Sequence, residues 1–206
     1  MADALCIFKP DAAHRVAARA ACADWLLGED GWKVRGLTWF QPAQALVEEH
    51  YDFLRGRPFF PWLVDFMSAL PVVVGRIEAS AEVLDRMRYE LGETRIHESR
   101  PGSLRERLGI GGGVNVLHLS DAPETGVSEV ALWSKHLDLS AIDAQLDRTP
   151  ERPDHTYHLR SLATQYGAGV HRELARAAIE RLLREESDLD DDRFPALARI
   201  VVEAFD

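Results

Sequence analysis

The chain has 206 residues, of which 46% are hydrophobic, and its formal net charge at pH 7 is −10. This length and apolar content are sufficient to bury one hydrophobic core, with room for an appendage. The acidic balance argues against a general nucleic-acid-binding protein, which normally has a basic surface, so an anionic ligand would need a local basic pocket.

Four segments are predicted to be strands because they are continuous in apolar residues or rich in β-branched and aromatic ones. They are residues 4–8, 32–40, 71–79 and 114–119. Helical spacing or an Ala- and Leu-rich composition predicts helices over the intervening and following segments. These are residues 14–27, 42–54, 58–70, 81–91 and 124–133. The order matches a βαββαβ, ferredoxin-like antiparallel sheet with helices on one face, an α+β fold of the broad α/β class.

Residues 92–113 are rich in glycine and charge, and we expect them to be a long functional loop without regular structure.

Cysteine usage and hydropathy predict the cellular compartment of the protein. Only Cys6 and Cys22 are present, both in apolar surroundings, so a disulfide framework is not expected. The chain starts without a basic leader followed by an apolar segment, and no apolar run reaches about 18 residues. We therefore expect a cytoplasmic protein that makes no membrane contact.

Six short motifs occur in the order and spacing of one enzyme family: KPDAAHR, RPFF, PVVV, LGET, RPGSLR and NVLHLSD. By these motifs, residues 3 to 134 resemble the nucleoside diphosphate kinases. The resemblance implies a kinase domain over residues 1–136. It also implies ping-pong transfer of the γ-phosphate of a nucleoside triphosphate to a nucleoside diphosphate through phosphorylated His118. Mg²⁺ would be held mainly by the nucleotide's phosphates, and the protein would form a homo-oligomer.

His118 is a chemically reasonable nucleophile because imidazole is partly unprotonated at neutral pH. One ring nitrogen attacks, so the other must be held by an acceptor, and Glu129 matches the family's orienting carboxylate. Taken alone, a histidine in an apolar strand is more often structural, and Glu129 would be an ordinary solvated helix residue.

The resemblance assigns further residues to the site, since the charge on a moving phosphoryl group must be stabilised. It implies phosphate contacts from Lys9, Arg88, Arg105 and Thr94, sugar contacts from Lys9 and Asn115, positioning of the lysine by Tyr51, a supporting hydroxyl from Ser120, and base stacking on Phe59.

The chain departs from the family pattern at three places. Leu119 replaces the glycine after the histidine, and it would be strained if that position required a positive φ. Gly112 stands where the family commonly has an aliphatic residue against the base, which predicts a one-sided clamp. The proline usual after Thr94 is absent. Two alternatives therefore stay open: a related kinase with an unusual nucleotide acceptor, and a nucleotide-binding or scaffolding protein without turnover.

Residues 137–206 lie outside the resemblance, and we expect them to form a helical C-terminal extension. A short helix and then a Pro- and charge-rich connection are predicted over 140–158, followed by helices at 170–188 and 194–205. The first of these two helices has a predicted apolar stripe at Val170, Leu174, Ala178 and Leu182, with Ile179 and Leu183 beside it. The extension could pack on its own domain or a neighbouring subunit, cover the nucleotide cleft or recruit a protein partner. DHTYH and DLDDD lack the full spacing of metal sites.

Overall fold

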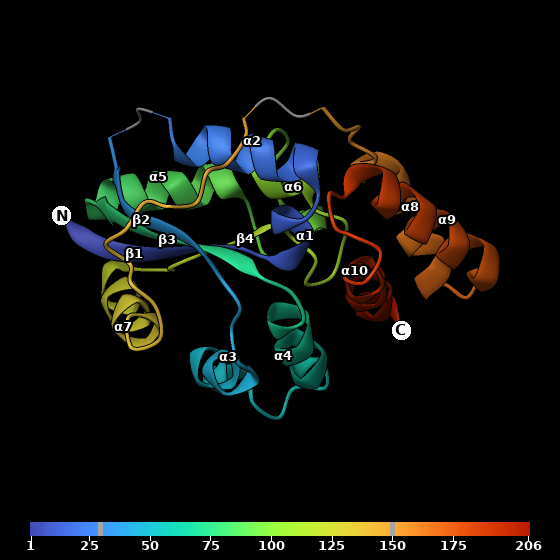
Figure 1. The fold of residues 1–206 in the computed structure, drawn as a ribbon, viewed down its shortest axis with the longest axis horizontal. Coiled ribbons are helices and arrows are strands. Elements are labelled where there is room, and N and C mark those ends of the chain that lie inside the picture. The colour runs from blue at the N-terminus through green and yellow to red at the C-terminus, as the bar shows by residue number, and fades with distance from the viewer. Residues whose placement is uncertain (29–30, 149–150) are drawn as a thin grey trace.

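The computed structural model describes residues 1–28, 31–148 and 151–206, and its centre is a four-stranded antiparallel sheet (Figure 1). The strands are β1 (Ala2–Phe8), β2 (Lys33–Phe40), β3 (Val72–Ala79) and β4 (Leu117–Leu119), in the spatial order β2-β3-β1-β4. All four predicted strands and the predicted ferredoxin-like α+β fold are confirmed.

Helices cover both faces of this sheet, so the expectation that they lie on one face is wrong. Figure 1 shows α2 (Val16–Leu26), α5 (Ala81–Leu91) and α6 (Leu104–Leu108) on one side, and α3 (Gln44–His50), α4 (Phe60–Ser68) and α7 (Pro123–Trp133) on the other. The reason lies in β1, whose alternate residues enter two separate cores. Leu5 and Ile7 belong to one core and Cys6 and Phe8 to the other, which is the burial expected of a central strand.

Several element boundaries differ from the expectation. The helix predicted over 14–27 begins only at Val16, because Arg15 before it is extended and pairs with Ser187, and a short helix that was not predicted, α1 (Pro10–Ala13), precedes it. The segment predicted as a structureless loop contains a 3-10 helix (Ile96–Glu98) and α6. The Ser103 side chain accepts a hydrogen bond from the Glu106 N–H at 3.4 Å and so caps α6.

The register of β4 on β1 decides where the sequence motif NVLHLSD presents its side chains. Ile7 pairs with His118, while Leu117 and Leu119 pair with Phe8 and Cys6. Both leucines enter the core beneath α2 and α5, so strand alternation turns His118 to the opposite face, toward α3 and α7.

The C-terminal extension is helical, as predicted, but its first helix was missed. It comprises α8 (Thr156–Gly167), α9 (Arg172–Glu186), α10 (Phe194–Val202) and a 3-10 helix (Glu203–Phe205). The short helix predicted after residue 140 is wrong, because residues 141–148 have no helix and Ile142 instead pairs with Leu37 at the sheet. Residues 149–150 of the predicted connection lie outside the described residues. Within α8, Leu159, Ala163 and Tyr166 supply the buried stripe.

The apolar face predicted for α9 is confirmed in its C-terminal half, where Ile179, Leu182 and Leu183 are buried. It is wrong at the N-terminal end, because Leu174 is 71% exposed and Val170 is 48% exposed, and Ala175 is buried in their place. The segments DHTYH and DLDDD, which lack the spacing of metal sites, contain carboxylates with local structural roles. The Asp154 carboxylate accepts from the Thr156 N–H at 2.9 Å, and the Asp190 carboxylate accepts from the Arg193 N–H at 2.9 Å.

The extension packs against the domain of its own chain. Figure 1 shows α8, α9 and α10 at the end of the domain that carries α1 and α4, and residues of α10 such as Leu197 and Ile200 share a core with Phe66 and Met67 of α4. The division into domains at residue 136 stays a prediction. Among the described residues, no helix is both long and apolar enough to cross a bilayer.

A buried arginine joins the extension to the domain. Arg15 is 1% exposed and donates to the Glu186 carboxylate, to the Thr156 hydroxyl at 2.5 Å and to the Leu108 carbonyl at 2.9 Å. Thr156 and Glu186 belong to α8 and α9, so this one guanidinium holds the ends of two extension helices against α6.

Glu186→Ala leaves the Arg15 guanidinium buried without its carboxylate. We expect it to lower the free energy of unfolding by about 3–5 kcal/mol. Asp188→Ala is the control, because Asp188 is exposed in its ion pair with Arg19. Its expected cost is below about 1 kcal/mol. Urea unfolding followed by tryptophan fluorescence measures both, and equal losses would contradict the buried role of Glu186.

Candidate active site

Nine of the ten residues singled out from the sequence line one cavity of about 580 Å³. The cavity lies between β4, α4 and the loop after α5, and its lining includes Lys9, Tyr51, Phe59, Arg88, Thr94, Arg105, Asn115, His118 and Glu129. The tenth, Ser120, is fully buried behind the histidine and contacts Glu129. The fold therefore brings together residues that are spread over more than half of the chain.

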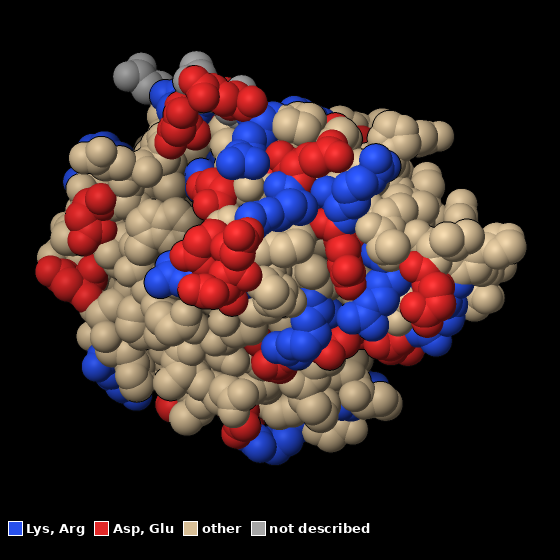
Figure 2. Space-filling view, turned by 45° about the vertical axis from the view of Figure 1, so that its right-hand side comes forward, with Lys and Arg blue, Asp and Glu red and all other residues tan. Residues whose placement is uncertain are grey.

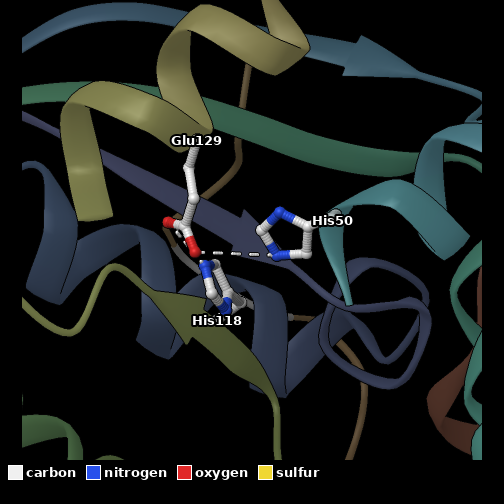
Figure 3. A group of neighbouring side chains, drawn as sticks. All are labelled: His50, His118 and Glu129. Atoms are coloured by element: carbon white, nitrogen blue, oxygen red, sulfur yellow. Dashed lines mark hydrogen bonds and ion pairs between the residues drawn. The ribbon is translucent and has the colours of Figure 1, made fainter. Parts of the chain in front are cut away.

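His118 is oriented by the carboxylate of Glu129 on α7. Its Nε2 lies 3.0 Å from Glu129 Oε2, and the Ser120 hydroxyl donates to the same oxygen at 2.6 Å. Because a carboxylate accepts hydrogen bonds, this contact places the proton of a neutral ring on Nε2 and leaves Nδ1 unprotonated. Figure 3 shows that the second ring nitrogen points away from Glu129. Burial acts to raise the pKa of Glu129, but its hydrogen bond to His118 and the nearby imidazoles outweigh burial and lower that pKa.

A second histidine, His50 at the end of α3, lies beside this pair and was missed by the sequence analysis. Its Nδ1 accepts a hydrogen bond from the Trp133 indole N–H at 3.2 Å, so its Nε2 carries the proton. That Nε2 has no hydrogen-bond partner among the described residues and lies 3.9 Å from Glu129 Oε1 (Figure 3). Burial and the neighbouring His118 lower the pKa of His50 to about 3, so the ring is neutral. The only sequence signal for His50 is its position next to Tyr51.

His50, His118 and Glu129 offer three ligand atoms within 4.8 Å of one another, which invites a test as a metal site. Two imidazoles and one carboxylate suit zinc better than magnesium, which prefers oxygen ligands. However, a metal ligand must present a lone pair, and the Trp133 indole keeps the proton of His50 on the nitrogen that faces the group. The hydrogen-bonding pattern therefore fits a proton-holding cluster and not a metal centre.

Three cations meet on the opposite wall of the cavity. Lys9 Nζ donates to Asn115 Oδ1 at 2.7 Å, and Arg105 donates to the carbonyls of Gly92 and Leu117 at 2.9 and 2.7 Å. Arg88 donates to the Leu119 carbonyl at 3.1 Å and pairs with the exposed carboxylate of Asp121.

These cations perturb one another, because they are held close together with little neutralising charge. Burial and the charge of Arg105 lower the pKa of Lys9 to about 7, and burial and Arg88 lower the pKa of Arg105 to about 10. The Nε of Arg105 is buried without a hydrogen-bond partner among the described residues. On the face drawn in Figure 2, basic and acidic side chains are intermixed. The cavity is thus the local basic pocket that an anionic ligand of this acidic chain requires.

The remaining predicted site residues, Tyr51, Thr94 and Phe59, also line the cavity. Tyr51 is buried with its ring 6.1 Å from the His118 ring, and burial raises the pKa of its hydroxyl. The Thr94 carbonyl accepts from the Asn115 amide at 2.8 Å, which ties the loop after α5 to the site. Phe59 is 49% exposed at the start of α4, so one face of its ring is accessible to a ligand.

The strained residue near the histidine is Val116 and not Leu119. Leu119 lies in β4 and is 2% exposed, so the suspected strain at that position is absent. Val116 has φ +68°, which costs a β-branched residue about 1–3 kcal/mol. Its N–H donates to the buried carboxylate of Asp11 at 3.0 Å, and its carbonyl accepts from the Lys9 N–H at 2.9 Å. These two bonds hold the bend that carries the chain from Asn115 to His118.

Comparison with known proteins agrees with the fold and the site. The family model described as nucleoside diphosphate kinase matches residues 2–139. A nucleoside diphosphate kinase from a Synechococcus strain is 42% identical over 110 residues, which is 53% of this chain and 72% of the relative. One from Carboxydothermus hydrogenoformans is 37% identical over 117 residues, 57% of this chain and 78% of the relative.

Solved structures give the same result. The nucleoside diphosphate kinase of Aquifex aeolicus superposes with a TM-score of 0.58 at 32% identity, covering 68% of this chain and 97% of its own. A halophilic one from Halobacterium salinarum, solved in complex with CDP, has a TM-score of 0.56 at 26% identity and covers 76% of this chain and 97% of its own. The chain belongs to the nucleoside diphosphate kinase family, with an extension beyond residue 139 that the family model does not match.

The lowered pKa of Lys9 predicts a pH-dependent stability. The unfolded chain keeps this lysine protonated up to a pH of about 10.4, whereas the folded protein releases the proton near pH 7. Unfolding therefore takes up a proton between these values, and stability rises with pH across that window by up to about 1.4 kcal/mol per unit.

Lys9→Met removes this titration, so its unfolding free energy should lack the rise between pH 7 and 10 and run parallel to that of the wild type below pH 7. Urea unfolding at a series of pH values checks the difference. Parallel curves from pH 7 to 10 would show that Lys9 keeps an ordinary pKa.

Proposed function

We propose that the protein transfers the γ-phosphate of a nucleoside triphosphate to a nucleoside diphosphate in a ping-pong reaction through phosphorylated His118. The observation that carries this proposal is the hydrogen bond from His118 Nε2 to Glu129. It leaves the other ring nitrogen as a neutral nucleophile in a cavity that Lys9, Arg88 and Arg105 also line. The family relationship supports the same activity.

In the first half-reaction, the lone pair of His118 Nδ1 attacks the γ-phosphorus. A phosphorus–nitrogen bond forms, the bond from that phosphorus to the β,γ-bridging oxygen breaks, and the nucleoside diphosphate leaves with the electron pair. In the second half, a terminal phosphate oxygen of the acceptor diphosphate attacks the phosphohistidine. The phosphorus–nitrogen bond breaks and the ring regains its lone pair, so the histidine is unchanged after one cycle.

The cations on the cavity wall supply the charge that the transferred group requires. Arg88 and Arg105 are anchored to backbone carbonyls, so their remaining N–H groups are held in place before the ligand arrives. The ligand's charge would also return Lys9 to its protonated form, because an anion nearby favours the ammonium. Thr94 would add a hydroxyl contact, and Asn115 with Lys9 would hold the sugar hydroxyls.

The carboxylate side of the site stabilises the ring as it gains positive charge. Glu129 receives N–H from His118 and O–H from Ser120, and the protonated Nε2 of His50 faces its other oxygen. Because the Trp133 indole fixes the His50 tautomer, His50 presents a donor to Glu129 and never a competing lone pair. His50 and Trp133 act as positioning residues for His118, together with the buried Tyr51, whose ring lies 6.1 Å from that of His118.

Mg²⁺ fits the site as a companion of the nucleotide. Among the described residues that line the cavity, Glu129 is engaged by His118 and Ser120, and Asp121 is the exposed carboxylate. Mg²⁺ usually binds through phosphates, water and one or two carboxylates, so Asp121 would contribute to holding it there. When bound, the ion would neutralise phosphate charge that develops in the reaction.

The remaining alternatives differ in their support. The case for a binding protein without turnover rested on Leu119 and on the long C-terminal extension. The backbone of Leu119 is an ordinary strand, so only the extension remains as a reason for it. An unusual acceptor is favoured only by the glycine at position 112. A homo-oligomer, a cytoplasmic location and a protein partner on the C-terminal helices stay predictions.

Incubation with γ-labelled ATP and Mg²⁺ should label the wild-type protein and leave His118→Ala unlabelled. The label should be acid-labile and alkali-stable, as expected of phosphohistidine, and added nucleoside diphosphates should discharge it. Calorimetry with ADP provides the control that His118→Ala still binds nucleotide. An unlabelled wild type that binds ADP would overturn the kinase proposal.

Glu129→Gln should slow phosphorylation of His118 about 100-fold, because the carboxylate no longer stabilises the proton on Nε2 in the transition state. Nucleotide affinity should change less than about twofold, since Glu129 lies on the side of the ring away from the phosphates. The matched control is Glu124→Gln on the exposed face of α7. Rapid-quench kinetics measure the rate, and equal rates in the two variants would remove Glu129 from the mechanism.

A further inference from the structure

The end of the C-terminal extension reaches the candidate active-site cavity. Ala204, in the 3-10 helix that follows α10, lines the same cavity as Phe59, Trp62 and Gly112. Nothing in the sequence motifs links residues 203–206 to the site, because they lie outside the matched region. We call residues 203–206 the C-terminal turn.

The glycine run at 111–113 is shaped to receive this turn and α4. A Cβ on Gly111 would lie 2.9 Å from the Phe205 ring, and one on Gly113 would lie 2.5 Å from the Trp62 ring. A Cβ on Gly112 would lie 3.5 Å from the Ala204 carbonyl oxygen, and Gly112 also has φ +54°. The position that lacks an aliphatic side chain is thus adjacent to a backbone segment that fills the neighbouring space.

The C-terminal turn is fixed from two sides. On one side, Arg199 of α10 pairs with Glu203 of the turn, and α10 is itself held by the Trp62 indole, which donates to the Ile200 carbonyl at 3.0 Å. On the other side, the Tyr166 hydroxyl of α8 donates to the Asp206 carboxylate at 2.9 Å. A segment held in this way can act as a wall, because little ordering remains to be done when a ligand arrives.

The turn also borders a second hollow. That hollow has a volume of about 730 Å³, and Phe205, Gly111 and Gly112 line it, whereas Ala204 lines the active-site cavity. Gly112 and Arg95 border both spaces, and the turn presents Ala204 to the cavity and Phe205 to the hollow.

We propose that the C-terminal turn is a wall of the base subsite, contributed by the extension of the same chain, and that Ala204 is a specificity-determining residue that contacts the nucleobase. This inference rests on the proposed function, since it takes the ligand to be a nucleotide whose base stacks on Phe59. The turn replaces the aliphatic contact that Gly112 cannot make. It ties the size and affinity of the base subsite to docking of the extension.

Chemical labelling tests the contact directly. Cys6 and Cys22 are both buried and burial raises their pKa values, so Ala204→Cys would carry the one readily alkylated thiol. With ADP at ten times its dissociation constant, alkylation of Ala204→Cys should slow about tenfold. Pyrophosphate, which has no base, should give little protection. Ala177→Cys on the exposed side of α9 is the control and should react at the same rate with or without ADP.

A second variant tests the function of the wall. Ala204→Trp should fill the base subsite and raise the dissociation constant of ADP at least about tenfold, while Ala177→Trp leaves it unchanged. ADP that neither protects Ala204→Cys nor binds more weakly to Ala204→Trp would overturn the proposal. A wild type that binds ADP with this protection but forms no phosphoenzyme would instead overturn the kinase activity and leave the wall intact.

Discussion

The hydrogen bond between Glu129 and His118 is the constraint on which the rest of the site depends. It fixes which ring nitrogen carries the proton. It also requires α7 to be held at a fixed distance from β4, the strand at the edge of the sheet. The Ser120 hydroxyl donates to this carboxylate, and His50, oriented by the Trp133 indole, lies 3.9 Å from its other oxygen. Each of these groups is buried and directional, so the chemistry of one imidazole is set by packing that extends through the core.

The cations that line the cavity lower the stability of the folded protein. Lys9 and Arg105 are buried near each other and near Arg88, and burial together with the neighbouring arginine charge lowers the pKa of both. Val116 adds backbone strain that the Asp11 carboxylate must hold in place. A polyphosphate would relieve the charge repulsion on binding. The site therefore gives up folding stability for ligand affinity, and the large apolar cores on both faces of the sheet offset that loss.

The C-terminal extension belongs to the same physical unit as the family domain. Its helices bury Arg15 at one end and place residues 203–206 beside the glycine run at the other. The glycines at 111–113 look like a weakened base clamp when only the family motifs are considered. Next to the extension they are the small residues that allow Phe205, Ala204 and Trp62 to approach. The departure in the motif and the added helices are two parts of one arrangement.

The sequence by itself determined the elements and the chemistry. Apolar runs and helical spacing found all four strands and most helices, and the motifs selected ten residues of which nine line one cavity. What the sequence could not supply were relations between distant segments. The coverage of both sheet faces, the break at Arg15, the tautomer of His50 and the approach of Ala204 each depend on groups far apart along the chain. Local propensity reports only on neighbours in sequence, whereas hydrogen-bond direction and burial are properties of the folded whole, so the tertiary structure decided them.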